Sequence, residues 1–373
     1  MSLHIDEVDD ARISTVSTSS QSYAYLVWRR FRRSVPGMLG LVLVCALLVT
    51  AIFAEFFAPM DPNASTASFA PPDKISFMRP DGFHPWPVAY SITESTELDP
   101  VTYQPMMGPD LENPRPIVLF GKGWPYRLWG VIPMQRHLFS LADGSALHLL
   151  GTDKLGRDIL ARGIVGSRIT LIIALISISL ITIIGTLAGI TSGYLGGRFD
   201  QWFQRFVEIV LAFPQLPLYL TLTTLIPVTA PSYIFISFVI LVISGLGWAQ
   251  LSREVRSKTM SLARIDYVRA ATAVGASDAR IITRHILPNV SSHVIVAVTL
   301  GIPTIILLES FLGFLGFAVK PPLISWGLML QDAGTFSVIG SYPWILSPVG
   351  FVLLAVFAFN ALGDGLRDAI DPY

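Results

Sequence analysis

Six long apolar stretches limit what this chain can fold into more than any other feature of its sequence. At a rise of about 1.5 Å per residue, a helix needs about 20 mainly apolar residues to cross the roughly 30 Å hydrocarbon layer of a bilayer. The stretches that meet this requirement cover approximately residues 36–58, 169–191, 203–225, 233–251, 290–317 and 345–362. Only 14% of the residues are charged, against about a quarter in a soluble domain. The sequence therefore predicts an all-α polytopic membrane protein with six transmembrane helices.

The charge balance and the cysteine and histidine content exclude several functions. Lys+Arg and Asp+Glu number 26 each, so no net field attracts nucleic acid. The single cysteine, Cys45, excludes an intrachain disulfide and a cysteine-based metal cluster. The histidines are scattered, without an HExxH pattern. We therefore expect no metal, no cofactor and no catalytic residues in this chain, and no nucleic-acid partner.

The distribution of basic residues predicts the orientation. Arg29, Arg30, Arg32 and Arg33 precede the first apolar stretch, and the positive-inside rule then places the N-terminal tail, residues 1–35, in the cytoplasm. With six spans the C-terminus is cytoplasmic as well. The segment 252–289 falls on the same side and is rich in Arg, whereas Lys320 is the only basic residue in the loop after the fifth span. The Ser-, Thr- and Asp-rich residues 1–22 are expected to be disordered.

The remaining chain divides into an insertion and a core. Residues 59–167 separate the first helix (36–58) from the second and are rich in Pro, Trp and Tyr, with no long helical period. The insertion exceeds the roughly 60 residues within which loop charge steers orientation. We expect a partly irregular periplasmic segment that lies over the mouth of the membrane domain. Residues 168–373 then form a core of five transmembrane helices with a cytoplasmic loop at 252–289.

Within that loop, start and stop signals predict two short helices. Residues 261–274 are rich in alanine, and Gly275 stands where a C-terminal cap with positive φ is needed. Ser277 can cap a second helix with Asp278 in its first turn, and that helix must stop or kink at Pro288. The small side chains would let the groove of another protein approach closely. Periodicity alone leaves an ordinary solvated loop equally open.

The same stretch resembles the EAA loop of ABC-transporter permeases, E-A-A-x-x-x-G followed by I-x-L-P. It matches that pattern at Ala270, Ala271, Gly275 and Leu287-Pro288, with Ile286 at the hydrophobic position, and departs from it where Arg269 replaces the Glu. In that family the loop is a coupling helix that docks into a cleft on the cytoplasmic ATPase. The resemblance thus implies an ATPase-coupling role for the following residues: Arg269, Ala270, Ala271, Gly275, Ala276, Ser277, Asp278, Leu287 and Pro288.

Four ordered blocks narrow the resemblance. "LLGTDKLGRDILARGIVGSRITL" (149–171), the loop block (270–289), "ESFLGFLGFAVKPPLISWG" (309–327) and the ending "LGDGLRDAIDPY" are similar to the C-type permease subunit of the dipeptide and oligopeptide importers. The resemblance implies a type I importer permease fold in the bacterial inner membrane, paired with a homologous second permease. It also implies two ATPase subunits, which bind ATP and Mg²⁺, and a periplasmic binding protein that delivers peptides.

The chain itself lacks the G-x-x-x-x-G-K-[ST] phosphate-binding motif, so we expect a non-catalytic transport subunit. Relatives of this family also carry oligosaccharides, opines and metal chelates, and these solutes remain alternatives to peptides. An ion-coupled secondary transporter that uses Glu208 or Glu309 is a further alternative, although no inverted repeat is evident among the six stretches.

Two further groups of residues are candidates for structural or pathway roles. Gly185, Gly189, Gly193 and Gly197 recur every four residues, which allows close helix packing in lipid, within this subunit or against another. Asp153, Arg157 and Asp158 precede the second span and could form a local ion-pair cluster or a periplasmic gate. Glu309 lies at membrane depth, where we favour a structural hydrogen bond over a place in the solute pathway or a role in proton coupling.

Overall fold

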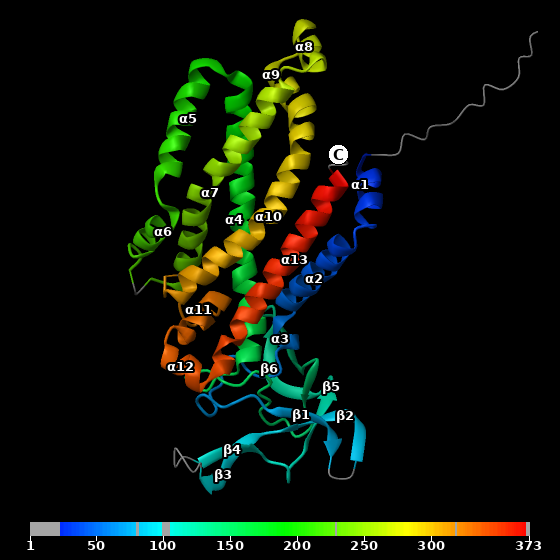
Figure 1. Cartoon of the computed structure of the whole chain (residues 1–373), viewed down its shortest axis with the longest axis vertical. Helices are drawn as coiled ribbons and strands as arrows, with labels where there is room; N and C mark the ends of the chain where they lie inside the picture. The colour runs from blue at the N-terminus through cyan, green and yellow to red at the C-terminus, as the bar shows by residue number, and fades with distance from the viewer. Residues whose placement is uncertain (1–22, 80–81, 99–104, 228–229, 318, 371–373) are drawn as a thin grey trace, which may run out of the picture.

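The computed structural model of this chain describes residues 23–79, 82–98, 105–227, 230–317 and 319–370. The tail predicted to be disordered, residues 1–22, lies outside the described residues. In the described chain the long helices run side by side as a bundle, with the strands gathered at one end (Figure 1). We call this end the strand end and the opposite one, where α8 (Asp266–Ala273) and α9 (Asp278–Ile281) lie, the loop end. The first short helix, α1 (Tyr23–Phe31), and the end of the last helix both lie toward the loop end (Figure 1).

Within the described residues, five helical segments are long and apolar enough to cross a membrane. α9, a π-helical segment (Ile282–Ile286) and α10 form one of these as a single 37-residue run, Asp278–Phe314, and a 3-10 turn (Pro343–Leu346) extends α13. The principal helices are α2 (Val35–Ile52), α4 (Ile159–Leu195), α7 (Ser232–Leu262), α10 (Leu287–Phe314) and α13 (Ser347–Ile370). Short helices complete the fold: α3 (Ala54–Phe57), α11 (Trp326–Leu330), a 3-10 turn (Gln331–Ala333) and α12 (Phe336–Ser341).

The third predicted span, 203–225, is not one straight helix. α5 (Gly197–Ala212) and α6 (Gln215–Thr223) are bent by 78° at a break between them. Phe213 is extended because a residue before proline avoids the helical region, and Pro214 has no N–H to continue the ladder. Counted as one span, the bent pair carries the chain back from the loop end to the start of α7, and the total becomes six (Figure 1).

α4 is the central helix, and glycines bring α7 close to it. A Cβ atom on Gly185 would lie 3.0 Å from Trp248 O, one on Gly189 would lie 2.6 Å from Ser252 O, and one on Gly193 would lie 2.7 Å from Arg256 O. Three of the four predicted packing glycines therefore face a helix of the same subunit. Gly197 does not, because it begins α5 and has open space around the position of a Cβ atom.

The insertion between α3 and α4 contains β-structure that the sequence did not predict. Its strands are β1 (Lys74–Arg79), β2 (Gly82–Tyr90), β3 (Ile92–Leu98), β4 (Pro105–Pro109), β5 (Arg115–Leu119), β6 (Lys122–Leu128), β7 (Ile132–Arg136) and β8 (Phe139–Leu141). β1, β2, β5 and β8 form an antiparallel sheet, and β3–β4 and β6–β7 are two-stranded hairpins. α4 begins at Ile159, before the predicted residue 169. Asp158 caps the helix there, and the polar side chains of its first turns find hydrogen-bond partners in other parts of the chain.

Candidate functional site

The turn between α8 and α9 is a Schellman motif centred on Gly275. Ala276 N donates to Ala271 O at 3.0 Å, and Gly275 N donates to Thr272 O at 3.0 Å. Gly275 has a φ of +81°, as the sequence predicted for this position. The motif ends α8 sharply and sets the direction in which α9 leaves.

The inner side of this α8–α9 segment (residues 266–286) is built into the bundle. Val268, Ile281 and Ile286 are fully buried in the main hydrophobic core, which also contains residues of α4 and α7. Ala271 and Ala276 pack against the same core. Because five apolar positions anchor it, the segment moves with the helices beneath it rather than as a free loop.

The outer side carries most of the predicted coupling residues. Arg269, Ala270, Gly275, Ser277, Asp278, Leu287 and Pro288 are exposed, whereas Ala271 and Ala276 are partly buried. Three apolar residues that the sequence reasoning missed join this face: Val274, which is 84% exposed, Tyr267 and Ile265. The sequence signal for Val274 is a β-branched residue directly before a cap glycine. Whether that side chain is exposed, however, depends on tertiary packing. We define the docking face as Ile265, Tyr267, Arg269, Ala270, Val274, Gly275, Ser277 and Asp278.

Side-chain hydrogen bonds tie the segment to its neighbours. Tyr194 Oη, near the end of α4, donates to Asp278 Oδ1 at 2.8 Å. Asn289 Nδ2 donates to Tyr267 Oη at 3.3 Å and to His285 O at 2.6 Å. Ser277 occupies the predicted N-cap position, but its side chain makes no capping bond, so that part of the prediction is wrong.

A second polar cluster connects three helices at the same end. Arg256 of α7 donates two hydrogen bonds to Asp200 of α5, Nε to Oδ1 and Nη2 to Oδ2, each at 2.5 Å. Ser192 Oγ of α4 donates to Asp200 Oδ1 at 2.5 Å. A bidentate Arg–carboxylate pair fixes orientation as well as distance. The α8–α9 segment is bonded to α4 through Tyr194, and this cluster in turn ties α4 to α5 and α7.

Of the predicted stop or kink at Pro288, the stop does not occur. The run Asp278–Phe314 continues through it, with the π-helical turn immediately before. Proline lacks the N–H for the i→i−4 bond and crowds the preceding turn, and one wider π turn accommodates both effects. The docking face is thus joined rigidly to the membrane-spanning part of α10.

Two connected grooves lead from the loop end along α7 and α10. The first, of about 450 Å³, is lined mainly by apolar residues of α4, α7 and α10, with polar Gln215, Gln250 and Thr304. The second, of about 780 Å³, opens between α7, α10 and α13. Glu254 lines both, and its Oε2 lies 3.5 Å from His293 Nε2. The grooves are concave surfaces on which a solute can rest while in contact with this subunit.

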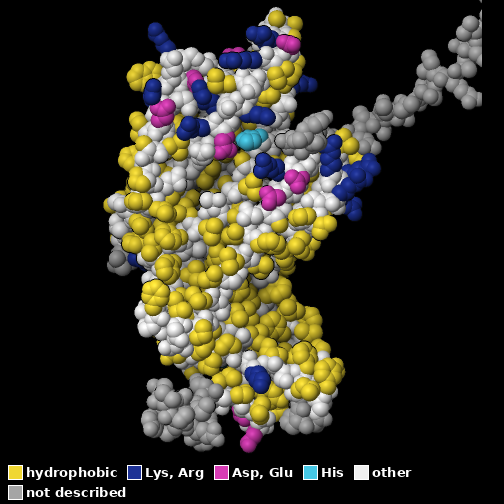
Figure 2. Space-filling model, viewed as in Figure 1, with side chains coloured by type: hydrophobic (Ala, Val, Ile, Leu, Met, Phe, Trp, Pro, Cys, Tyr) yellow, Lys and Arg dark blue, Asp and Glu magenta, His cyan; other side chains and the backbone are white. Residues whose placement is uncertain are grey.

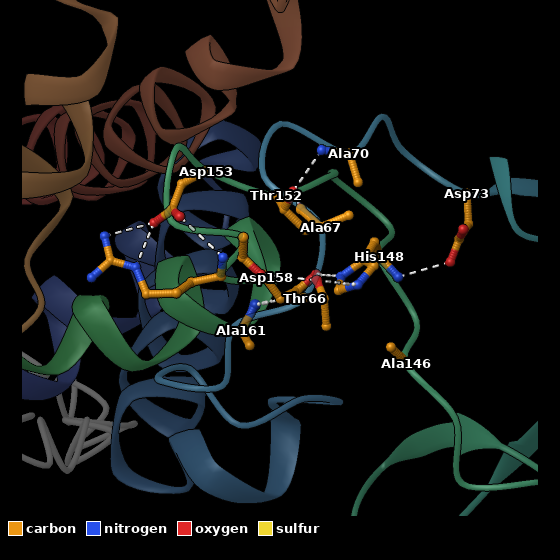
Figure 3. A network of polar contacts seen from close by, with 12 residues as sticks. Thr66, Ala67, Ala70, Asp73, Ala146, His148, Thr152, Asp153, Asp158 and Ala161 are labelled. Atoms are coloured by element: carbon orange, nitrogen blue, oxygen red, sulfur yellow. Dashed lines mark hydrogen bonds and ion pairs between the residues drawn. The ribbon is translucent and has the colours of Figure 1, made fainter. Parts of the chain in front are cut away.

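At the strand end, the predicted charged residues are satisfied by internal partners (Figure 3). Asp153 Oδ2 accepts from Arg157 Nε at 2.7 Å, an i to i+4 pair within the predicted ion-pair cluster. Asp158 caps α4, because its Oδ2 accepts from Ala161 N at 2.7 Å, and its Oδ1 lies 3.0 Å from His148 Nδ1. His148 N donates in turn to Asp73 Oδ2 at 2.8 Å. This network attaches the insertion to the beginning of α4.

Two carboxylates near the strand end have basic partners. Burial raises the pKa of Asp73 in the insertion, despite the hydrogen bond from His148 N and the charge of Arg115. Glu55 in α3 pairs with Arg168, whose Nη1 donates to Glu55 Oε1 at 2.6 Å.

Glu309 is fully buried between helices and lines neither groove. Its Oε2 accepts from Thr170 Oγ1 of α4 at 3.1 Å, and Thr170 Oγ1 also accepts from Trp326 N at 3.1 Å. The carboxyl group thus joins α10, α4 and α11, the structural role favoured from the sequence. Among the described residues, no group of three or more His, Cys, Asp or Glu side chains is placed to hold a metal ion.

These features describe a helical membrane protein with an exposed helical corner fixed to its bundle, and comparison with known proteins places it in a family. Residues 181–373 match the family described as the binding-protein-dependent transport system inner membrane component. Residues 22–72 match the N-terminal TM domain of oligopeptide transport permease C. The chain belongs to the family of inner membrane components of binding-protein-dependent transport systems, and it is a transmembrane permease subunit.

Three relatives illustrate the similarity. The oligopeptide transport system permease protein OppC of Haemophilus influenzae is 41% identical over 226 residues, which cover 60% of this chain and 70% of the relative. The OppC protein of Bacillus subtilis is 39% identical over 226 residues, 60% of this chain and 72% of the relative. The dipeptide transport system permease protein DppC of Bacillus subtilis is 37% identical over 229 residues, 61% and 69% of the two chains.

Proposed function

We propose that this chain is the peptide-translocating permease subunit of an ATP-driven importer. It pairs with a homologous second permease, docks two ATPase subunits that bind ATP and Mg²⁺, and receives peptides from a periplasmic binding protein. The family supports the transport role, and relatives named for oligopeptide and dipeptide transport support the substrate class.

The observation that carries this proposal is the two-sided character of the α8–α9 segment. Its inner residues are fixed in the bundle core, while its outer residues are exposed, and Val274 at their edge is 84% exposed. Several exposed apolar side chains on one helical corner, here Ile265, Tyr267 and Val274, suit a contact surface for another protein. A cleft on an ATPase is the partner that the family relationship suggests.

A docking face transmits force only if the two states of the ATPase contact it differently. Closure of the ATPase pair would displace the segment, and Tyr194, Asp200 and Arg256 would pass that displacement to α4, α5 and α7. The groove along α7 and α10 would then open alternately toward the two sides of the membrane. The solute would move between this subunit and its homologue.

Charge supports an orientation with the loop end in the cytoplasm. Arg29, Arg30, Arg32 and Arg33 are exposed at that end, and Lys and Arg side chains gather there on the face shown in Figure 2. The positive-inside rule then assigns both chain ends and the docking face to the cytoplasm. The strands, together with Asp153, Arg157 and Asp158, would lie on the periplasmic side near the pathway entrance.

The ion-coupled alternative needs a carboxylate that faces the pathway at membrane depth. Glu309 is enclosed by Thr170 and the surrounding helices, and Glu208 forms an exposed pair with Arg205 at 2.8 Å. Neither position supports ion coupling. Oligosaccharides, opines or metal chelates would use the same machinery, with the binding protein selecting the solute.

Co-purification tests the proposal. We expect the tagged chain, co-expressed with the permease, ATPase and binding-protein genes that neighbour its own, to purify with both ATPases. In proteoliposomes, peptide-loaded binding protein should stimulate ATP hydrolysis above the rate with unloaded binding protein. Solute uptake by this chain alone, without ATP, would contradict the proposal. Stimulation by a non-peptide solute only would overturn the substrate class and leave the transport class standing.

A further inference from the structure

The turn of the β6–β7 hairpin presents apolar side chains to the surroundings. Trp129, Val131 and Ile132 are 55%, 76% and 46% exposed, and they follow one another around Gly130. We call these three residues the hairpin tip. The strands behind the tip are polar enough to remain in water, because Arg127, Gln135 and Arg136 are exposed. A hairpin with an apolar tip and polar strands is stabilised when the tip alone enters an apolar environment.

The position of the tip relative to the first spanning helix identifies that environment. Trp129 Nε1 donates to the carbonyl oxygen of Ile52, the last residue of α2, at 3.0 Å. The Trp129 ring also lies against Phe53, with ring centroids 5.5 Å apart. The tip is therefore held at the level where the apolar helix ends.

That level still belongs to the membrane, because α2 alone is short. Its 18 residues give a length of about 27 Å, against roughly 30 Å of hydrocarbon. Phe53–Phe57 and apolar residues of the insertion beside them lie directly beyond this end and can supply the missing thickness. Exposed Phe120 lies 6.2 Å, between ring centroids, from Phe56. Figure 2 shows hydrophobic side chains continuing from the helices onto the strand end.

The charged groups at the same level are neutralised by each other. Arg168 Nη1 donates to Glu55 Oε1 at 2.6 Å and Nη2 to Oε2 at 2.8 Å, and Arg168 Nε donates to Ala51 O at 3.0 Å. A bidentate pair at this depth suits the boundary between headgroups and hydrocarbon. Tryptophan is enriched at that boundary, because its ring is apolar and its N–H is polar.

We propose that the hairpin tip inserts into the lipid bilayer at the strand end and anchors the strand-bearing insertion to the membrane surface. The lipid side of α2, which exposes Leu39, Val42 and Val49, continues directly into the tip through Ile52 and Phe53. Arg127 and Arg136 lie behind the tip, where lipid phosphates are available to them. The anchor fixes the tilt of the insertion relative to the membrane. Its insertion into lipid does not depend on which solute is transported.

Depth-dependent fluorescence quenching in nanodiscs tests the anchor. Cys45 is first replaced by Ala. Val131→Cys, at a position that is 76% exposed, is then labelled with bimane in the full transporter. Two matched variants carry the same label: Val49→Cys on the lipid side of α2, and Glu112→Cys in the exposed polar turn between β4 and β5. Each is exposed to lipids brominated near the headgroup and to aqueous iodide.

We expect brominated lipid to quench the Val131→Cys label at least about twice as strongly as the Glu112→Cys label, and iodide to show the reverse order. The Val49→Cys label should respond to lipid only. Equal quenching of the Val131→Cys and Glu112→Cys labels by iodide, with no lipid effect, would overturn the anchor. Protection of the Val131→Cys label by added binding protein, again without lipid quenching, would overturn it in favour of a protein contact.

Discussion

At the scale of single residues, Gly275 and Val274 differ in how far the sequence reveals them. The positive φ of Gly275 follows from local chemistry, because an alanine-rich helix followed by glycine, a small residue and Ser predicts an αL cap. The exposure of Val274 depends on how α8 packs on the bundle, which no local pattern contains. The Arg269 side chain is exposed in the position where the family pattern has Glu. Its contact with a partner stays a prediction.

Gly275→Val tests the residue scale. A β-branched residue at φ +81° adds about 1–2 kcal/mol of backbone strain or more, and relief of that strain re-aims α9. We expect solute-stimulated ATP hydrolysis to fall to the basal rate while membrane insertion is unchanged. Gly144→Val is the matched control, because Gly144 has a φ of +70° and open space but lies in the insertion. Full stimulation in Gly275→Val would count against the docking role.

At the scale of elements, apolar length predicted the long helices well and their irregularities poorly. A proline inside an apolar run signalled the break at Phe213–Pro214. The size of the bend, 78°, depends on how α6 packs against α7, which the local sequence does not reveal. Pro288 gave the same local signal and the opposite outcome, because a π turn keeps that helix continuous. The glycine stripe was predicted by its spacing, except at Gly197, where the helix had already ended.

Gly189→Leu tests the contact between α4 and α7. A Cβ atom there would lie 2.6 Å from Ser252 O and 2.8 Å from Val255 Cβ, so the two helices must separate, which should cost about 1–3 kcal/mol. We expect a lower unfolding midpoint for the chain in lipid nanodiscs. Gly245→Leu on α7, where the added side chain meets open space, should leave the midpoint unchanged. Equal midpoints for the two variants would show that α4 and α7 tolerate the added volume.

At the scale of the whole molecule, the sequence predicted a helical bundle with a large insertion; the structure confirms both, and the family confirms the membrane bundle. The β-structure of the insertion was not predictable, because its strands include prolines and lack clean alternation, as in β2 with Pro85 and Pro87. Its attachment to α4 depends on Asp73 and Asp158 both contacting His148, and spacing does not reveal these contacts. Orientation and partners depend on charge and on the family relationship.

Cross-linking from the docking face tests the central claim most directly. In the Cys45→Ala background, Val274→Cys carries a photoactivatable cross-linker in the co-expressed transporter. Val131→Cys at the strand end is the control. We predict that Val274→Cys cross-links to an ATPase subunit, that ATP binding changes the yield, and that Val131→Cys gives no such product. Absence of an ATPase adduct from Val274→Cys, or labelling of this residue from the periplasmic side of intact cells, would contradict the claim that the α8–α9 segment couples transport to ATP.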